Sequence, residues 1–358
     1  MRVLLVTGSS GGHIFPALAL MDRLKLSDVD LLMALPENNN SKIMAGLGKV
    51  EYIHASKLGF NLSSKNIREA FFFFIGTWQG LRIILKFKPD VVVGFGSLYT
   101  VSILFLAWFF RIKTIIHEQN VVPGRANRLL AKFVDKVAVS FAQTGRYLNI
   151  SQEKVILTGN PIRSDLVRLD KKKALDYFNF KEGKFNILIT GGSQGSHKLN
   201  TVCSIALSGC QQKNDLQLIH ISGALDFALV KQSYMQTAIT HQVFEFLSDM
   251  RYAYSVADLV ISRAGATTIA ELQRFNLPAL LIPYPFAYAH QLNNAKVLEG
   301  SGSALIIPDE ELTVERLRDQ LYLLLSDPQR LKVMRQTYTK TQSLDATALL
   351  ANEVLNLN

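Results

Sequence analysis

The sequence predicts an α/β protein of two domains, each with a parallel sheet covered by helices on both faces. Three observations lead to this prediction. Short apolar runs alternate with longer helix-like stretches along the 358-residue chain, as in parallel-sheet proteins. A glycine-rich loop follows one such run in each half of the chain. A Gly-Asn-Pro turn at 159–161, followed by a charged stretch over 165–184, indicates a boundary between the halves.

The strands are assigned from short apolar runs bounded by turn or helix signals. In the first half we expect strands over residues 3–7, 29–34, 91–94, 114–117 and 136–139. In the second half we expect them over residues 186–190, 216–222, 243–246, 259–262, 279–282 and 304–307. The segments between them are helix-like, and the last segment, 345–355, is expected to be a helix.

The two glycine-rich loops are Gly8-Ser-Ser-Gly-Gly-His13 and Gly191-Gly-Ser-Gln-Gly195. Glycine allows a sharp turn and a close approach of the backbone to a ligand. The N–H groups at the start of the following helix then attract an anion, usually a phosphate. Two such loops favour a transferase with two phosphorylated substrates and two domains that face a shared cleft.

Composition indicates a globular protein, with 48% hydrophobic and 19% charged residues. Residues 1–160 hold 19 Lys+Arg and 10 Asp+Glu, a balance of +9, and residues 161–358 hold 20 and 19, a balance of +1. A basic half points to nucleic acid or an anionic membrane surface. Two cysteines, Cys203 and Cys210, suggest no disulfide framework and fit a reducing compartment. We expect no signal peptide, because the chain enters a strand at once.

Aromatic and basic residues interleave over residues 65–88. The apolar ones include Phe71, Phe72, Ile75 and Trp78, and the basic ones are Lys65, Arg68, Arg82, Lys86 and Lys88. This composition is typical of a segment that lies on a membrane surface, although a buried amphipathic helix is an equal alternative. The apolar run over 101–110 is too short to cross a bilayer, which takes about 20 residues. We interpret that run as an ordinary buried helix.

Several residues could carry chemistry. His13, in the first loop, could be a general base, because the ordinary pKa of histidine lies near neutrality; capping its helix or contacting a phosphate are the alternatives. Arg163 could bind a phosphate through its forked guanidinium or lie at the surface. Glu271, one turn into a helix, could accept hydrogen bonds from a ribose or complement the helix dipole. Gln291 could bind sugar hydroxyls or cap a helix.

Other site classes lack their signals. Asp28 and Asp30 lie at the start of a strand, so we do not read them as a metal site, and no His/Cys cluster has zinc spacing. The first loop lacks the full G-x-G-x-x-G order, and there is no G-x-x-x-x-G-K-[ST] loop. We therefore predict neither a metal nor a cofactor.

Seven segments in order resemble the MurG family of lipid I N-acetylglucosaminyltransferases. They are Gly8-x-x-Gly-Gly-His-Ile-Phe-Pro16, Gly94-Phe-Gly96, His117-Glu-Gln-Asn120, Gly159-Asn-Pro-Ile-Arg163, Gly191-Gly-Ser-Gln-Gly195, Ser262-Arg-Ala-Gly-Ala266 through Glu271, and His290-Gln291 with Asn294-Ala295. Each segment alone is a weak signal. Together they span nearly the whole chain, and a chance match of all seven in family order is improbable.

The resemblance implies a GT-B fold of two Rossmann-like domains, residues 1–160 and 161–341, with a C-terminal helix over 342–358 that returns to the first. The second domain would bind UDP-GlcNAc and the first undecaprenyl-diphosphate-MurNAc-pentapeptide (lipid I). The product would be lipid II, made with inversion for peptidoglycan, and hence for cell shape and division. The resemblance also implies a peripheral enzyme on the anionic cytoplasmic face of the bacterial membrane. Cell-wall synthesis and division proteins are candidate partners, and nucleic acid is not.

Residue roles follow from the matched positions. His13 matches the catalytic base. Donor contacts fall on Ser10, Gly11, Gly12, Asn120, Arg163, Ser193, Leu247, Ala266, Thr267, Thr268, Ile269, Ala270, Glu271 and Gln291. Acceptor diphosphate contacts fall on Gly94, Gly96 and Ser97. Membrane contacts fall on Phe71, Phe72, Ile75, Trp78, Arg82 and Lys86.

Two positions depart from the family pattern. Ser10 replaces a threonine and keeps the hydroxyl. Ser97 replaces the last glycine of a Gly-x-Gly-Gly-Tyr pattern, and Tyr99 is displaced by one position. This second departure falls where the family loop meets the acceptor diphosphate, so another lipid acceptor is the alternative to lipid I.

The resemblance implies a metal-independent displacement. His13 would take the proton from the acceptor 4-hydroxyl while that oxygen attacks C1 of GlcNAc. Helix N-termini after Gly195 and Gly265, together with Arg163, would stabilise the departing diphosphate. Three rivals remain: a GT-B enzyme acting on another lipid such as diacylglycerol, a UDP-sugar epimerase, and a non-enzymatic basic module on membranes or nucleic acid.

Overall fold

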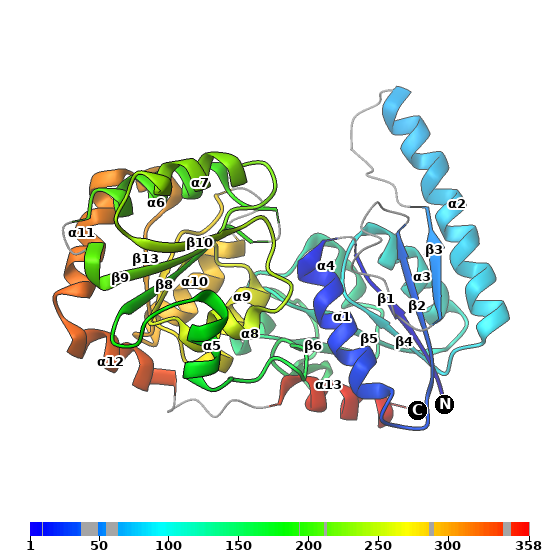
Figure 1. The fold of residues 1–358 in the computed structure, drawn as a ribbon. Coiled ribbons are helices and arrows are strands. Elements are labelled where there is room, and N and C mark those ends of the chain that lie inside the picture. Colours follow the sequence, from blue (N-terminus) through cyan, green and yellow to red (C-terminus); the bar gives the residue numbers. More distant parts are fainter. Residues whose placement is uncertain are drawn as a thin grey trace. The chain divides into compact units, whose positions relative to one another are not determined.

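The computed structural model describes residues 1–8, 10–36, 49–54, 64–192, 194–210, 213–285, 290–338 and 345–357, without the side chains of residues 64–70. The chain divides into two compact units. Unit 1 comprises Met1–Ser164 and Leu344–Asn358, and unit 2 comprises Asp165–Ser343. Figure 1 shows unit 1 from blue to teal with the final red helix, and unit 2 from green to orange.

Unit 1 holds, in its described part, a seven-stranded sheet of order β3-β2-β1-β4-β5-β6-β7. Every neighbouring pair in it is parallel. Its strands are β1 (Arg2–Val6), β2 (Asp30–Pro36), β3 (Val50–Ile53), β4 (Val91–Gly94), β5 (Lys113–Glu118), β6 (Lys136–Val139) and β7 (Val155–Leu157). Its α-helices are α1 (Gly11–Leu24), α2 (Ser64–Phe87), α3 (Leu98–Phe109), α4 (Arg125–Leu130) and α13 (Ala346–Leu355).

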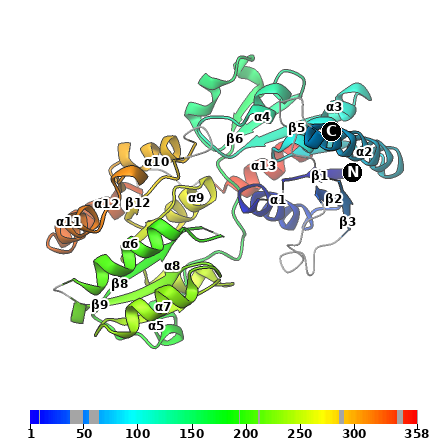
Figure 2. The same cartoon turned by 90° about the horizontal axis from the view of Figure 1, so that it is seen from above.

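The first strand shows why unit 1 has helices on both faces of its sheet. Successive strand residues point to opposite faces. Val3 and Leu5 accordingly belong to a core cluster with residues of α1 and α13, and Leu4 and Val6 belong to another with residues of α2, α3 and α4. Figure 1 shows α1 and α13 side by side, and Figure 2 shows the same for α2 and α3.

The C-terminal helix is fixed to unit 1 by polar as well as apolar contacts. Lys136 Nζ lies 2.7 Å from Glu353 Oε2, and Thr347 Oγ1 donates to the carbonyl of Ile162 at 2.9 Å. The side chains of Leu350 and Val354 are fully buried. The helix predicted over residues 345–355 is thus present as α13, Ala346–Leu355 with Asp345 as its N-cap, and it completes the core of the first unit.

Unit 2 holds, in its described part, a six-stranded parallel sheet of order β10-β9-β8-β11-β12-β13. Its strands are β8 (Phe185–Thr190), β9 (Leu216–Ile221), β10 (Thr240–Phe244), β11 (Leu259–Ser262), β12 (Ala279–Leu281) and β13 (Ala304–Ile306). Its α-helices are α5 (Lys171–Phe178), α6 (His197–Ser208), α7 (Phe227–Met235), α8 (Met250–Val256), α9 (Ala266–Phe275), α10 (His290–Gly300), α11 (Val314–Leu325) and α12 (Pro328–Thr337). Helices cover both faces of this sheet (Figure 1).

Both sheets reverse their strand order at one place, which confirms the predicted doubly covered parallel sheets. In unit 1 the reversal places β1 beside β4, and in unit 2 it places β8 beside β11. Ligands of open α/β sheets bind outside the carboxyl ends of the strands at such a switch point. The glycine-rich segments lie there, after β1 and β4 in one unit and after β8 and β11 in the other.

The interpretation of residues 101–110 as an ordinary buried helix is only half right. The inner face of α3 is buried at Ile103, Leu104 and Ala107. Its outer face leaves Phe105, Trp108 and Phe109 between 42% and 67% exposed. No helix within the described residues is long and apolar enough to cross a membrane.

Candidate functional site

His13 lies in the first turn of α1, between the loop after β1 and the loop after β4. Its Nδ1 lies 2.9 Å from the Ser10 hydroxyl. A Cβ placed on Gly8 would come 2.5 Å from Nδ1, and one placed on Gly96 would come 3.3 Å from Nε2. The imidazole therefore packs against two glycines that no larger residue could replace without displacing it. Burial lowers the pKa of His13 from 6.5 to about 4, so the ring is neutral at pH 7.

Ser97 adopts a backbone conformation that normally requires glycine. Its φ is 101° and its ψ is 158°, a region that is almost exclusive to glycine and costs other residues about 1–3 kcal/mol. Gly96 beside it has a φ of 88°. The departure from the family pattern thus falls on a strained residue at the N-terminus of α3, directly after Gly96, which lies close to the His13 imidazole.

A buried carboxylate organises the turn after β5. Glu118 is 1% exposed. Its Oε1 accepts from the backbone N–H and the side-chain amide of Asn120, and its Oε2 accepts from Gly124 N–H and from Asn127 Nδ2 at 2.8 Å. Burial raises the pKa of Glu118, and these hydrogen bonds act in the opposite direction. The amide of Asn120, a predicted donor contact, is therefore fixed by its neighbour.

The same turn braces the loop that carries Gly96. Gln119 Nε2 donates to the carbonyl of Phe95 at 3.1 Å. His117 Nε2 lies 3.0 Å from the carbonyl of Gly159, and burial lowers the pKa of His117 to about 4. The segment 117–120 is thus largely internal scaffolding of unit 1, a role that its polarity alone did not reveal.

The inter-domain segment holds Asn160 and Arg163. Asn160 is 6% exposed, and in the described part of the chain neither polar atom of its amide has a hydrogen-bond partner. Arg163 is partly buried at the end of unit 1. An unsatisfied buried amide costs about 1–3 kcal/mol, which makes Asn160 a candidate site residue that the sequence analysis did not name.

The second glycine loop packs tightly against the turn after β9. Gly195 has a φ of 77°, and a Cβ on it would lie 2.1 Å from the carbonyl oxygen of Ser222. Gly223, with a φ of 81°, likewise leaves no room for a side chain beside Gln194. The glycines are therefore required for the close packing of two backbones. Ser193, a predicted donor contact, lies outside the described residues.

Helices at the glycine-rich loops begin without a side-chain cap. This holds for α1, α3, α6 and α9. An Asp or Thr side chain caps α5, α8, α11, α12 and α13, whereas α4 and α7 share the uncapped pattern. First-turn N–H groups have no partner within the helix, so an uncapped start at a switch point suits an anion.

The segment after β11 divides into buried and accessible positions. Ala266 is 6% exposed and Ile269 is fully buried, and the Ile269 N–H donates to Gly265. The predicted contact at Ile269 therefore cannot involve its side chain. Thr267, Thr268 and Ala270 are partly exposed.

Glu271 and Leu247 contribute different groups to the predicted donor contacts. Glu271, partly exposed, accepts a hydrogen bond from the Tyr254 hydroxyl at 2.7 Å. Leu247, 4% exposed, follows β10 with its side chain in the core, which leaves its main chain as the part that could meet a base. Burial raises the pKa of Tyr254 well above its ordinary value, so the phenol remains a donor to Glu271.

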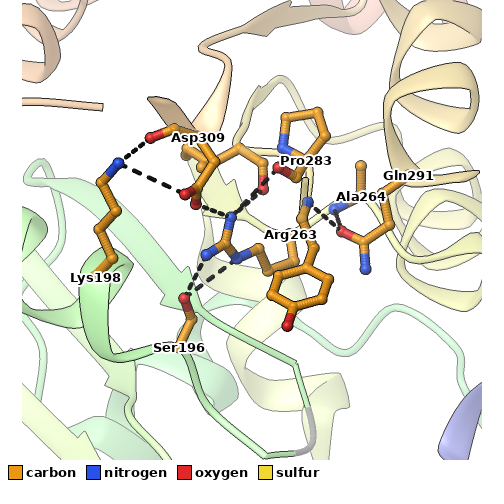
Figure 3. Close-up of polar contacts among 9 residues, drawn as sticks. Ser196, Lys198, Arg263, Ala264, Pro283, Gln291 and Asp309 are labelled. Atoms are coloured by element: carbon orange, nitrogen blue, oxygen red, sulfur yellow. Dashed lines mark hydrogen bonds and ion pairs between the residues drawn. The ribbon is translucent and has the colours of Figure 1, made fainter. Parts of the chain in front are cut away.

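Gln291 joins two loops of unit 2. Its Oε1 accepts from the backbone N–H of Ala264 at 3.1 Å and of Tyr284 at 2.9 Å (Figure 3). These bonds orient the side-chain amide, so that Nε2 is the end that could donate to a sugar hydroxyl. Arg263, which the sequence analysis left without a role, directly precedes Ala264, is 8% exposed, and has its guanidinium 5.6 Å from the centre of the Tyr284 ring.

The exposed face of α2 carries an aromatic and basic stripe. Phe71, Phe74 and Trp78 are between 61% and 70% exposed, and they lie on one helix face with Arg82 and Lys86, which are also exposed. Phe72 and Ile75 are partly buried, and Phe72 stacks on His54. The stripe itself is therefore not part of the core, whereas Ile83 and Ile84 on another face of α2 are buried in it. Among the described residues, no three His, Cys, Asp or Glu side chains are placed to hold a metal ion.

Two family models match the chain. The glycosyltransferase family 28 N-terminal domain matches residues 3–139, and the family 28 C-terminal domain matches residues 186–350. A curated relative from Halothermothrix orenii is 36% identical over 347 residues, 94% of either chain. It is named UDP-N-acetylglucosamine--N-acetylmuramyl-(pentapeptide) pyrophosphoryl-undecaprenol N-acetylglucosamine transferase.

Solved structures agree with the fold. The crystal structure of Acinetobacter baumannii MurG has a TM-score of 0.78 and 26% identity, and the match covers 99% of each chain. The UDP-GlcNAc 2-epimerase of Neisseria meningitidis, solved with UDP-GlcNAc bound, has a TM-score of 0.71 at 15% identity, with 99% of this chain and 100% of that chain covered. The second likeness shows the fold alone.

Proposed function

This chain belongs to glycosyltransferase family 28, and from that premise we infer that it is a UDP-N-acetylglucosamine--N-acetylmuramyl-(pentapeptide) pyrophosphoryl-undecaprenol N-acetylglucosamine transferase. The observation that carries this conclusion is the 36% identity over 94% of both chains. Its two units are the Rossmann-like domains of a GT-B enzyme. The donor is UDP-GlcNAc and the acceptor is the lipid-linked MurNAc-pentapeptide, so the product is lipid II.

We propose that His13 is the general base. Nε2 can accept the proton of the MurNAc 4-hydroxyl only if the hydrogen of the neutral ring is on Nδ1. The Ser10 hydroxyl, 2.9 Å from Nδ1, accepts that hydrogen. The lowered pKa keeps the ring unprotonated at pH 7, and a neighbouring diphosphate would raise that pKa towards the range of an effective base.

The leaving group is UDP, and we propose that helix N-termini of unit 2 and the side chain of Arg163 stabilise its charge. The uncapped starts of α6 and α9 supply N–H groups, and Arg163 supplies a forked cation. Glu271 accepts from the ribose, Gln291 donates to the sugar, and the main chain of Leu247 meets the uracil. Preorganised donors of this kind contribute about 10²–10³ each to turnover. The mechanism needs no metal.

We propose that the aromatic and basic stripe of α2 holds the enzyme at the anionic cytoplasmic face of the membrane as a peripheral protein. Its aromatic residues would enter the interface, while Arg82 and Lys86 face anionic headgroups. Trp108 and Phe109 of α3, which packs on α2, extend the apolar surface. Cell-wall synthesis and division proteins are candidate partners that the family resemblance alone implies.

The experiment that tests the function offers labelled UDP-GlcNAc, in the presence of EDTA, to three acceptors: a short-chain lipid I analogue, diacylglycerol, and none. We expect label only in the lipid I analogue. Label in diacylglycerol instead would move the acceptor to another lipid and would implicate the strained Ser97 loop. Conversion of the donor without any acceptor would indicate an epimerase.

A further inference from the structure

Arg263 lies at the carboxyl end of β11, and its guanidinium makes contacts with three other strand-end loops. Nε and Nη2 donate to the Ser196 hydroxyl, at 3.2 and 2.7 Å, in the loop after β8. Nη1 donates to the carbonyls of Ile282 and Pro283 after β12, and to Asp309 Oδ1 after β13 at 2.5 Å. Figure 3 shows the guanidinium between Ser196 and Asp309.

The charges in this cluster are paired within the protein. Asp309, with a side chain 15% exposed, also contacts Lys198 of α6, which approaches both its carbonyl and its carboxylate. The Arg263 side chain is 9% exposed, and the guanidinium lies 5.6 Å from the centre of the Tyr284 ring. A buried guanidinium of this kind is arranged to hold loops in place, since each of its three nitrogens already donates to a protein acceptor.

We propose that Arg263 is a positioning residue that sets the relative geometry of the loops after β8, β11, β12 and β13, with Asp309 and Ser196 as its anchors. Arginine suits this role because its planar fork donates in several fixed directions, which a lysine cannot reproduce. The loops it joins include the helix starts of α6 and α9. Misplacing catalytic or binding groups by about 1 Å can cost about 10²-fold in rate.

The inference rests on the proposed donor site and predicts a specific effect on the nucleotide. Arg263→Lys should raise the dissociation constant of UDP, measured by titration calorimetry, about tenfold or more. Ser196→Ala keeps the guanidinium charge and removes only the contact to the α6 loop, so it should weaken UDP binding severalfold, and Ser196→Thr should restore it. If Arg263 instead contacted the phosphate directly, Ser196→Ala would leave the dissociation constant of UDP unchanged.

The matched control is Arg318→Lys. Arg318 also donates to backbone carbonyls, those of Ala206 and Ile205 at the C-terminal end of α6, away from the strand-end loops. Arg318→Lys should lower the melting temperature about as much as Arg263→Lys does and should leave UDP binding unchanged. Wild-type UDP affinity in both Arg263→Lys and Ser196→Ala, or equal loss in Arg318→Lys, would overturn the proposal. If the wild-type protein binds UDP but transfers no sugar, the proposed function is overturned. The comparison of UDP binding among the Arg263, Ser196 and Arg318 variants still tests the positioning role.

Discussion

The imidazole of His13 lies against the bare α-carbon of Gly96, where an added Cβ would come 3.3 Å from Nε2. His13 lies in the first turn of the helix that follows β1, and Gly96 lies in the loop after β4, the neighbour of β1 at the switch point of the first sheet. The reactive nitrogen of the proposed base thus faces the loop assigned to the acceptor diphosphate.

Gly96→Ala should lower kcat at least tenfold and leave UDP binding unchanged, because the new methyl group displaces Nε2 and the φ of 88° strains alanine. Steady-state kinetics and UDP calorimetry check this. Gly183→Ala is the matched control, since Gly183 has a φ of 78° and open space around its Cβ position. Gly183→Ala should lose about as much stability as Gly96→Ala and should keep wild-type activity. Equal activity in the two variants would contradict the placement of the acceptor at Gly96.

Ser97→Gly should raise the free energy of unfolding by about 1 kcal/mol, because relief of a strain of about 1–3 kcal/mol exceeds the entropic cost of glycine. Denaturant unfolding, followed by a spectroscopic signal from unit 1, measures this change in the free energy of unfolding. Ser97→Ala keeps the Cβ and the strain while it removes the hydroxyl, so it should not gain stability. A Ser97→Gly variant no more stable than Ser97→Ala would show that the backbone there is relaxed.

The pH dependence of kcat/KM should report the lowered pKa of His13. A base is active when unprotonated, so activity falls as the pH falls through its pKa in the free enzyme. With the pKa of His13 at about 4, kcat/KM should remain nearly constant from pH 8 to pH 5.

The competing expectation is a base with the ordinary pKa of 6.5, which would lose about tenfold per pH unit below that value. Such a profile would contradict His13 as a base with a lowered pKa. Circular dichroism at each pH distinguishes loss of activity by protonation of the base from loss of activity by unfolding.

Burial also lowers the pKa of His117 and His220, to about 4 and about 3. These two groups therefore contribute stability that is fully present above pH 6.5 and is lost as the pH falls towards their pKa values in the folded protein.

Reversing the charge of the α2 stripe should release the enzyme from vesicles. The double substitution Arg82→Glu and Lys86→Glu should abolish cosedimentation with vesicles that contain anionic lipid, because it converts attraction into repulsion. Lys172→Glu with Lys173→Glu, on exposed positions of α5 in unit 2, makes the same charge change and should not. If both double substitutions released the enzyme from the vesicles, binding would depend on net charge alone and not on the α2 stripe.

The fold could be predicted from sequence where strands lie inside a sheet. Central strands such as β1 and β8 are continuous apolar runs, because both faces of a parallel sheet are covered. The edge strands β3 and β7 were missed, since Glu51 and Tyr52 are exposed and the residues of β7 are not fully buried. The strand expected over 243–246 is instead Thr240–Phe244, which is also an edge strand.

The site could be predicted only where a residue type signals its own role. Glycine-rich loops and His13 do so. The partnership of Arg263 with Asp309, and that of Glu118 with Asn127, join segments that no local pattern links. The exposure of Trp108 likewise depends on which face of α3 meets the sheet, and a uniformly apolar helix does not reveal that face.

The central claim is tested most directly by the structure of the disaccharide made from UDP-GlcNAc and a short-chain lipid I analogue. We expect proton NMR of the product to show GlcNAc in the β configuration on O4 of MurNAc, because a single displacement inverts the α-linked donor. An α-linked sugar, a different linkage position, or an altered UDP-sugar with no disaccharide would contradict the account.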